Sequence, residues 1–210
     1  MQIKPLLKSL QTQLLDNKSF LFFLVLGSLS SLLWIIGDTS LNALMYNRTA
    51  IVDGEYWRVI TGHLVHSNGW HLLLNLASLF MIGLLFSQHL SIRFWLISFL
   101  SSAMIISGCY YWIAPEYHYY VGLSAVLYGV IIIGALLDLK QQPLIALLIL
   151  VVVTGRVIWQ QYSGSMDSLA DLIEDRVAIE SHLFGICSGY VIGLVLVVKQ
   201  RYLDFQPVKD

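Results

Sequence analysis

Two apolar segments of this chain begin with a polar residue of a type that seldom occurs in such segments without a function. Ser124 follows Gly122 and Leu123 at the start of one apolar run, and His182 begins another about sixty residues later. A serine hydroxyl is a weak nucleophile until a base takes its proton, and neutral histidine is the usual base at neutral pH. A polar group inside hydrocarbon costs on the order of 3 kcal/mol. We therefore interpret Ser124 and His182 as a candidate nucleophile and base within a membrane.

Attack on an amide also requires hydrogen-bond donors for the negative charge that develops on the carbonyl oxygen. His71 and Asn75 are four residues apart, so both project from one face of a helix. They are candidate oxyanion donors, with the backbone N–H of Ser124 as a third. Tyr128 follows Ser124 by one helical turn, where its ring is expected to pack against His182 and hold the imidazole. This scheme requires no carboxylate, metal or cofactor.

The composition indicates a membrane protein. Hydrophobic residues make up 57% of the 210 residues and charged residues only 12%, with a mean hydropathy of +0.73. A soluble domain of this length carries roughly a quarter charged residues. The net charge of −1 gives no indication of nucleic-acid binding.

Apolar runs of about 17 to 25 residues cross a bilayer core as helices. The chain contains six such runs, or slightly shorter ones, and we expect an all-α polytopic bundle forming a single membrane domain over residues 1–210. The predicted spans are 19–37, 69–88, 92–113, 124–139, 143–161 and 180–199, with an outer loop over 38–68. The first run is expected to be a retained helix and not a cleaved signal peptide, because no A-x-A pattern follows it.

The charges predict the orientation of these spans. With the N-terminus inside, eight of the twelve Lys and Arg residues lie on the cytoplasmic side, as the positive-inside rule requires. Both termini are therefore expected in the cytoplasm, and His71, Ser124 and His182 share the outer side. The fourth span is the shortest: its sixteen residues rise only ~24 Å, against a core about 30 Å thick. Ser124 is thus expected below the outer surface, at the floor of a water-accessible cavity.

These residues resemble those of the rhomboid intramembrane serine proteases, and the resemblance runs from Glu55 to Gly193. Several motifs occur in the family's order: the Trp-Arg element, the H-x-x-x-N motif, a motif similar to G-x-S-G, the tyrosine four residues after the nucleophile, and H-x-x-G-x-x-x-G. In this sequence they are Trp57-Arg58, His71 with Asn75, Gly122 to Ala125, Tyr128, and His182 with Gly185 and Gly189. The resemblance implies a Ser124–His182 dyad that cleaves membrane-anchored proteins near the outer face.

The main departure is Ala125, where the family commonly has glycine. Alanine is still small enough for close helix contact, so we expect activity to survive. Gly185 and Gly189 are interpreted as packing residues that bring the sixth span close to the fourth. The compact size and the run from Gly62 to His66 resemble the rhombosortase branch of bacterial rhomboids. That branch implies a location in the bacterial inner membrane, an active site facing the periplasm, and substrates with a C-terminal Gly-Gly, apolar helix and basic tail.

Two other functions are alternatives to the protease. A metal site could draw on the nitrogens of His63, His66, His71 and His182, but no H-E-x-x-H occurs and no acidic residue accompanies these histidines within a span. A catalytically inactive rhomboid-like protein would bind membrane clients without cutting them. Such a protein is expected to lack the serine or the histidine, and both are present. The protease is therefore the favoured function.

Overall fold

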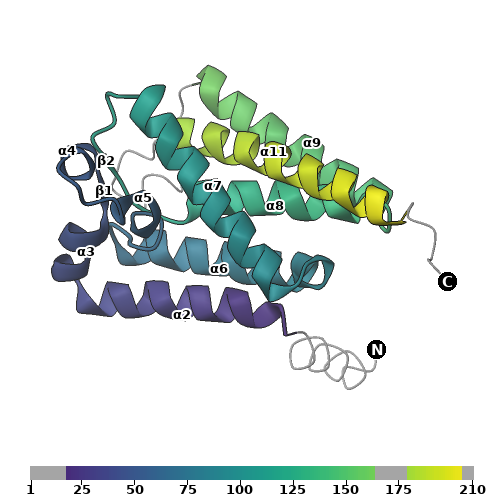
Figure 1. Cartoon of the computed structure of the whole chain (residues 1–210), viewed down its shortest axis with the longest axis horizontal. Helices are drawn as coiled ribbons and strands as arrows, with labels where there is room; N and C mark the ends of the chain where they lie inside the picture. The colour runs from purple at the N-terminus through teal and green to yellow at the C-terminus, as the bar shows by residue number, and fades with distance from the viewer. Residues whose placement is uncertain (1–17, 164–178, 205–210) are drawn as a thin grey trace.

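The computed structural model describes residues 18–163 and 179–204, and side chains as far as residue 200. Its longest elements are apolar helices packed side by side, as Figure 1 shows. The helices are α2 Phe20–Ile36, α3 Asp38–Leu44, α4 Arg48–Val52, α5 Arg58–Thr61, α6 Gly69–Phe86, η1 Ser87–His89, α7 Ile92–Trp112, α8 Ser124–Asp138, α9 Pro143–Ser163 and α11 Ile179–Asp204. Two-residue strands, β1 Tyr46–Asn47 and β2 Tyr119–Tyr120, pair antiparallel.

The predicted all-helical membrane bundle is confirmed, and each predicted span corresponds to a helix. Four helical segments are long and apolar enough to cross a membrane: α6 with η1, α7, α9, and α11 as far as Gln200. The first predicted span is α2, which continues into α3 through a bend of 116° at Gly37. Gly37 has a φ of +75°, a conformation that glycine adopts without steric cost. The protein is therefore a multi-pass membrane protein.

Helix α8 is the shortest of the six and forms the centre of the bundle. Eleven of its 15 residues are buried. It packs against α6, α7, α9 and α11, and it lies between α6 and the α9–α11 pair in Figure 1. The apolar faces of α9 lie outward instead; Leu144, Leu148 and Val151 are more than half exposed. Because other helices surround α8, those helices and not lipid determine its position.

The segment between α2 and α6 is folded, and hydrogen bonds from Arg58 stabilise it. The Arg58 guanidinium is buried, donates to the backbone carbonyls of Asn42 and Met45, both at 2.9 Å, and pairs with Glu55 at 2.6 Å. Strand β1 of this segment pairs with β2, matching Tyr46 with Tyr120. The chain that leads into α8 is thus held by the segment that leads into α6.

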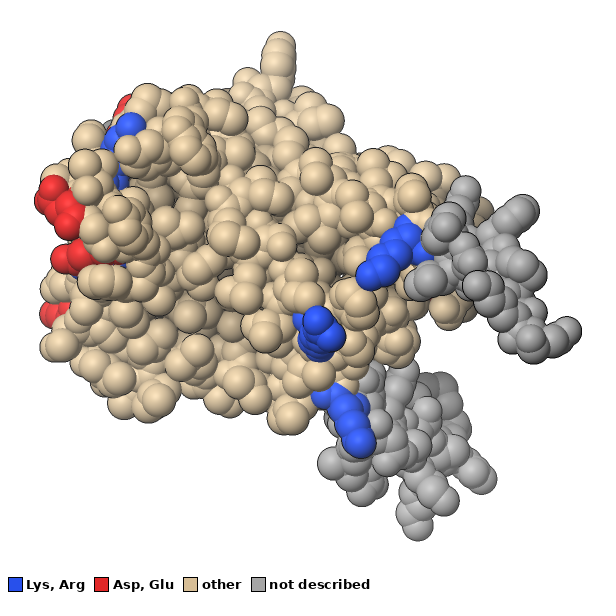
Figure 2. Space-filling view, viewed as in Figure 1, with Lys and Arg blue, Asp and Glu red and all other residues tan. Residues whose placement is uncertain are grey.

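Charged side chains gather at the two ends of the bundle. Figure 2 shows acidic groups together with some basic groups at the end that carries α3 and α4, basic groups alone at the opposite end, and an uncharged surface between them on this face. An uncharged belt between charged ends is what a bilayer requires of the surface that it surrounds.

Candidate active site

The turn before α8 brings the Gly122-Leu123-Ser124 motif against α6. Gly122 has a φ of +108°, and a Cβ at this position would overlap the imidazole of His71, with Cε1 only 2.6 Å away. The Gly122 N–H donates to the carbonyl of Gly62 at 3.1 Å, and the Tyr120 hydroxyl donates to the Gly122 carbonyl at 2.8 Å. The motif requires glycine at 122 for both its backbone angle and its contact with His71.

The first turn of α6 directs His71 and Asn75 toward this motif. Asn68 caps the helix by accepting from the His71 N–H at 2.9 Å, and the Ser67 hydroxyl lies 3.1 Å from His71 Nδ1. Both His71 and Asn75 are buried. In the part of the chain that the structure describes, Asn75 Nδ2 has no hydrogen-bond partner, and it would lie 3.5 Å from a Cβ on Gly122. A buried amide donor therefore faces the turn that carries Ser124.

Ser124 begins α8, beside Tyr120. Burial raises the pKa of Tyr120 to about 12, an effect that hydrogen bonding to Ser124 and to the backbone of Ala125 reduces but does not cancel. The serine itself is partly buried. Tyr120 thus links the nucleophile candidate to the β1–β2 pair.

His182 lies in the first turn of α11 and is buried between α8 and α9. Its ring lies 4.4 Å from the ring of Tyr128, measured between centroids. Its Nδ1 is 3.1 Å from Oε1 of Gln160 on α9. Sequence reasoning missed Gln160, although a glutamine within an apolar span was a visible signal, because it does not indicate which neighbour the amide contacts.

Helices α8 and α11 approach closely enough for backbone contact. A Cβ on Gly185 would overlap the Ala125 carbonyl oxygen and lie 3.2 Å from Cβ of Tyr128. One turn on, a Cβ on Gly189 would lie 2.5 Å from the Gly129 carbonyl oxygen. Ala125 is completely buried, and its backbone carbonyl faces Gly185. The contacts bring the turn of α11 that carries His182 opposite the start of α8.

Two further histidines are buried next to these residues: the ring of His66 packs on His71, and the ring of His63 packs on Tyr120. His63 Nε2 lies 3.2 Å from the Ser107 hydroxyl and 3.3 Å from the Ala103 carbonyl oxygen. Burial lowers the pKa of His63 to about 4. Burial and the neighbouring His71 lower the pKa of His66 to about 3. Both imidazoles are therefore neutral at pH 7. Within residues 18–163 and 179–204, no three His, Cys, Asp or Glu side chains converge as metal ligands do.

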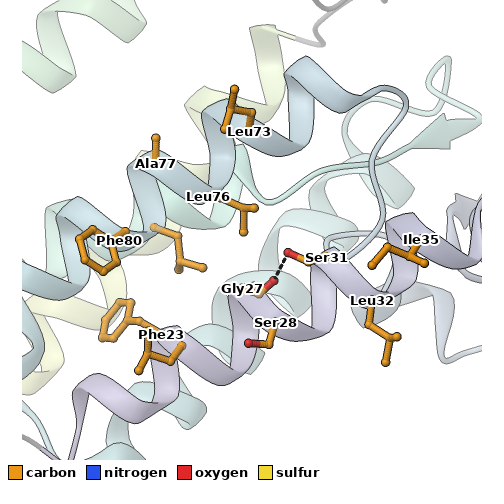
Figure 3. Close-up of a pocket in the computed structure, with 12 residues that line it drawn as sticks. Phe23, Gly27, Ser28, Ser31, Leu32, Ile35, Leu73, Leu76, Ala77 and Phe80 are labelled. Atoms are coloured by element: carbon orange, nitrogen blue, oxygen red, sulfur yellow. Dashed lines mark hydrogen bonds between the residues drawn. The ribbon is translucent and has the colours of Figure 1, made fainter. Parts of the chain in front are cut away.

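An apolar groove of about 660 Å³ lies between α2 and α6, on the other side of α6 from His71 and Asn75. Figure 3 shows Phe23 of α2 facing Phe80 of α6, and Ser31 donating to the Gly27 carbonyl at 2.8 Å. None of the candidate site residues lines it. The groove is therefore separate from the region around Ser124.

The fold and these clustered residues define a class, the polytopic helical membrane proteins with a polar site enclosed by the bundle. Residues 53–199 match the model of one family, described as the Rhomboid domain. The chain is also 26% identical over 157 residues to "Putative rhomboid protease YdcA" of Bacillus subtilis (strain 168), with 72% of each chain covered. The chain belongs to the rhomboid family, and that part of the sequence prediction is confirmed.

Proposed function

We propose that this protein is an intramembrane serine endopeptidase in which Ser124 is the nucleophile and His182 the general base. The observation that carries the proposal is the contact of Gly122 with His71 and Asn75. It brings two side-chain donors of α6 to the turn that precedes the only serine of α8, while Tyr128, one turn later, packs on His182. A nucleophile, a base and charge-stabilising donors are the parts that acyl transfer needs.

In the proposed reaction, Ser124 Oγ attacks the carbonyl carbon of the scissile amide and His182 Nε2 takes the hydroxyl proton. The oxyanion is stabilised by His71 Nε2, Asn75 Nδ2 and the Ser124 backbone N–H. His182 then returns the proton to the leaving amine, and an ester remains on Ser124. A water molecule, deprotonated by His182, hydrolyses this ester and restores the serine.

The His71 role requires a particular tautomer. To donate through Nε2, the neutral imidazole must be unprotonated at Nδ1. The Ser67 hydroxyl, 3.1 Å from Nδ1, supplies a donor for that nitrogen. The Ser67 hydroxyl can also accept, so it is compatible with this tautomer without imposing it, and it is the proposed oxyanion role that requires the hydrogen on Nε2.

The substrates follow from the family: membrane proteins whose anchoring segment enters beside the bundle. We propose that residues 1–210 form one membrane domain in the bacterial inner membrane, with both termini cytoplasmic and Ser124 toward the periplasm. The acidic and basic ends of the molecule support this orientation (Figure 2). The run from Gly62 to His66 supports the rhombosortase branch, whose substrates are exported proteins with a Gly-Gly, apolar helix and basic tail.

The test compares the wild type with Ser124→Ala and His182→Ala on a reporter protein held in the membrane by one apolar helix. Cleavage is expected only from the wild type, and it should persist after chelation of divalent metals. Cleavage by either variant at the wild-type rate would eliminate the dyad. Absence of cleavage by any of the three, together with retention of the reporter on purification, would favour a client-binding protein. For the branch, deletion of the gene should leave Gly-Gly-tailed exported proteins unprocessed; normal processing would exclude it.

A further inference from the structure

Helix α9 directs two polar side chains toward the surroundings of His182. Gln160 is 6% exposed, and its Oε1 lies 3.1 Å from His182 Nδ1. One turn earlier, Arg156 Nε lies 3.3 Å from the Tyr128 hydroxyl, which it can reach as a donor. Helix α9 therefore contacts both the imidazole and the aromatic ring packed on it.

The Gln160 contact decides where the imidazole carries its proton. An amide oxygen only accepts hydrogen bonds, so the Nδ1 that faces it must hold the hydrogen. A neutral imidazole has one such hydrogen, and Nε2 then presents a lone pair as an acceptor. The other tautomer would place two acceptors against each other in a buried site, which is unfavourable.

A buried glutamine in a membrane span can also serve only to join two helices. The neighbouring Gln161 joins α9 to α11 in this way, because its Nε2 donates to the Ile179 carbonyl at the start of α11, at 2.7 Å. Gln160 bonds instead to Nδ1 of His182, and a hydrogen on Nδ1 leaves Nε2 free to accept the Ser124 proton. Of the two adjacent glutamines, Gln161 therefore ties α9 to α11, whereas Gln160 contacts the proposed base.

We propose that Gln160 is a positioning residue that holds His182 in the tautomer and orientation in which Nε2 accepts the Ser124 proton. The proposal rests on the proposed function of Ser124 and His182. It assigns α9 a part in catalysis that no motif in the sequence indicates.

The test measures the rate at which a fluorophosphonate labels the purified full-length protein in detergent, across pH. In this reaction Ser124 Oγ bonds to phosphorus, the P–F bond breaks, fluoride leaves, and His182 Nε2 takes the proton. The variants are Gln160→Met, which keeps the length but removes the acceptor, and Gln160→Glu, which keeps an acceptor. Gln161→Met is the matched control, because it removes an amide from the same turn of α9.

Gln160→Met should label about ten-fold more slowly than Gln161→Met, the effect of one buried hydrogen bond. Gln160→Glu should retain the rate at high pH, and the acid limb of its pH–rate profile should move up by about one unit or more, because a carboxylate stabilises the imidazolium. The other groups around the ring are unchanged: Tyr128 of α8 packs on it, and Glu180 on its own helix accepts from the Tyr117 hydroxyl at 2.6 Å.

Equal rates for Gln160→Met and Gln161→Met would overturn the proposal, as would a Gln160→Glu profile that overlays the wild type. If Gln160→Met does not fold, judged by thermal melting, the Gln160→Glu profile decides alone. Failure of the proposed function has a different result, namely labelling of Ser124→Ala at the wild-type rate. The two failures are therefore distinguishable.

Discussion

Substitution of Gly189 by alanine should remove most of the activity while the protein remains folded. The added Cβ would lie 2.5 Å from the Gly129 carbonyl oxygen and 2.9 Å from both Gly129 Cα and Ile132 Cβ. Two of these three atoms belong to the backbone of α8, which cannot turn aside as a flexible side chain does. Ordinary contact begins near 3.4 Å, so α8 and α11 must separate there by about 0.9 Å, the difference between the two distances.

A separation of this size affects the rate of the reaction much more than it affects the stability of the fold. Overpacking of a core by one methyl group costs about 1–3 kcal/mol. Gly189 follows His182 by two turns, about 10 Å along α11, so the displacement is transmitted to the imidazole along a rigid helix. A misplacement of about 1 Å reduces catalysis by about 100-fold. We therefore expect Gly189→Ala to remain folded and to lose about two orders of magnitude in activity.

The assay is the rate of reporter cleavage in membranes, with thermal melting of the purified protein in detergent as the measure of folding. Gly155→Ala is the matched control: Gly155 is a helical glycine of α9 with nothing within 4 Å of the added Cβ. It should keep its activity and melt at the wild-type temperature or slightly above, because alanine favours helix. If Gly189→Ala cleaves as fast as Gly155→Ala, the reasoning from close helix contact is refuted.

Three further predictions concern other parts of the site and its support. Gly122→Ala should be folded yet inactive, because alanine disfavours a φ of +108° and its methyl group displaces His71; cleavage near the wild-type rate would contradict this. Arg58→Met should lower the unfolding free energy by about 1–3 kcal/mol, because the carbonyls of Asn42 and Met45 lose the donor that the buried guanidinium supplies, whereas Glu55→Gln, on the more exposed partner, should change the melting temperature little. The pKa of His63 is about 4 in the folded protein and 6.5 in the unfolded chain, so the unfolded state takes up more protons below pH 6.5. The contribution of His63 to stability is then complete above that pH and decreases as the pH falls toward 4, by about 2 kcal/mol between pH 7 and 5. Melting measured at both pH values checks this, and the decrease should be smaller in His63→Asn.

The sequence predicted the helices well because hydropathy is a property of each segment alone. The boundaries of 92–113 and 124–139 differ by one residue from those of α7 and α8. The shortness of the fourth span predicted that Ser124 lies below the outer surface, which stays a prediction; that α8 is the central helix of the bundle was not predicted. The register of the motifs could be read in the same way, since spacings of three and four residues place side chains on one helical face.

Features set by contacts between distant segments could not be read from the sequence. The predicted outer loop 38–68 contains α3, α4 and α5, whose short lengths give no clear periodicity, and β1 pairs with a strand more than seventy residues away. The direction of Gln160 depends likewise on how α9 packs against α11. The bend at Gly37 is a further case, because a glycine in an apolar run indicates freedom of the backbone but not the angle adopted.

The close packing of α8 against α11 also bears on the biosynthesis of the protein. At about 5–20 residues per second, the chain between Ser124 and His182 takes on the order of 3–12 s to make. During that interval α8, at 15 residues too short to cross a bilayer unaided, lacks the helix whose glycines receive it. The proposed nucleophile is then without its base while earlier helices are already inserting. If Ser124 and His182 act as proposed, the protein is inert toward neighbouring nascent chains until α11 has entered the membrane.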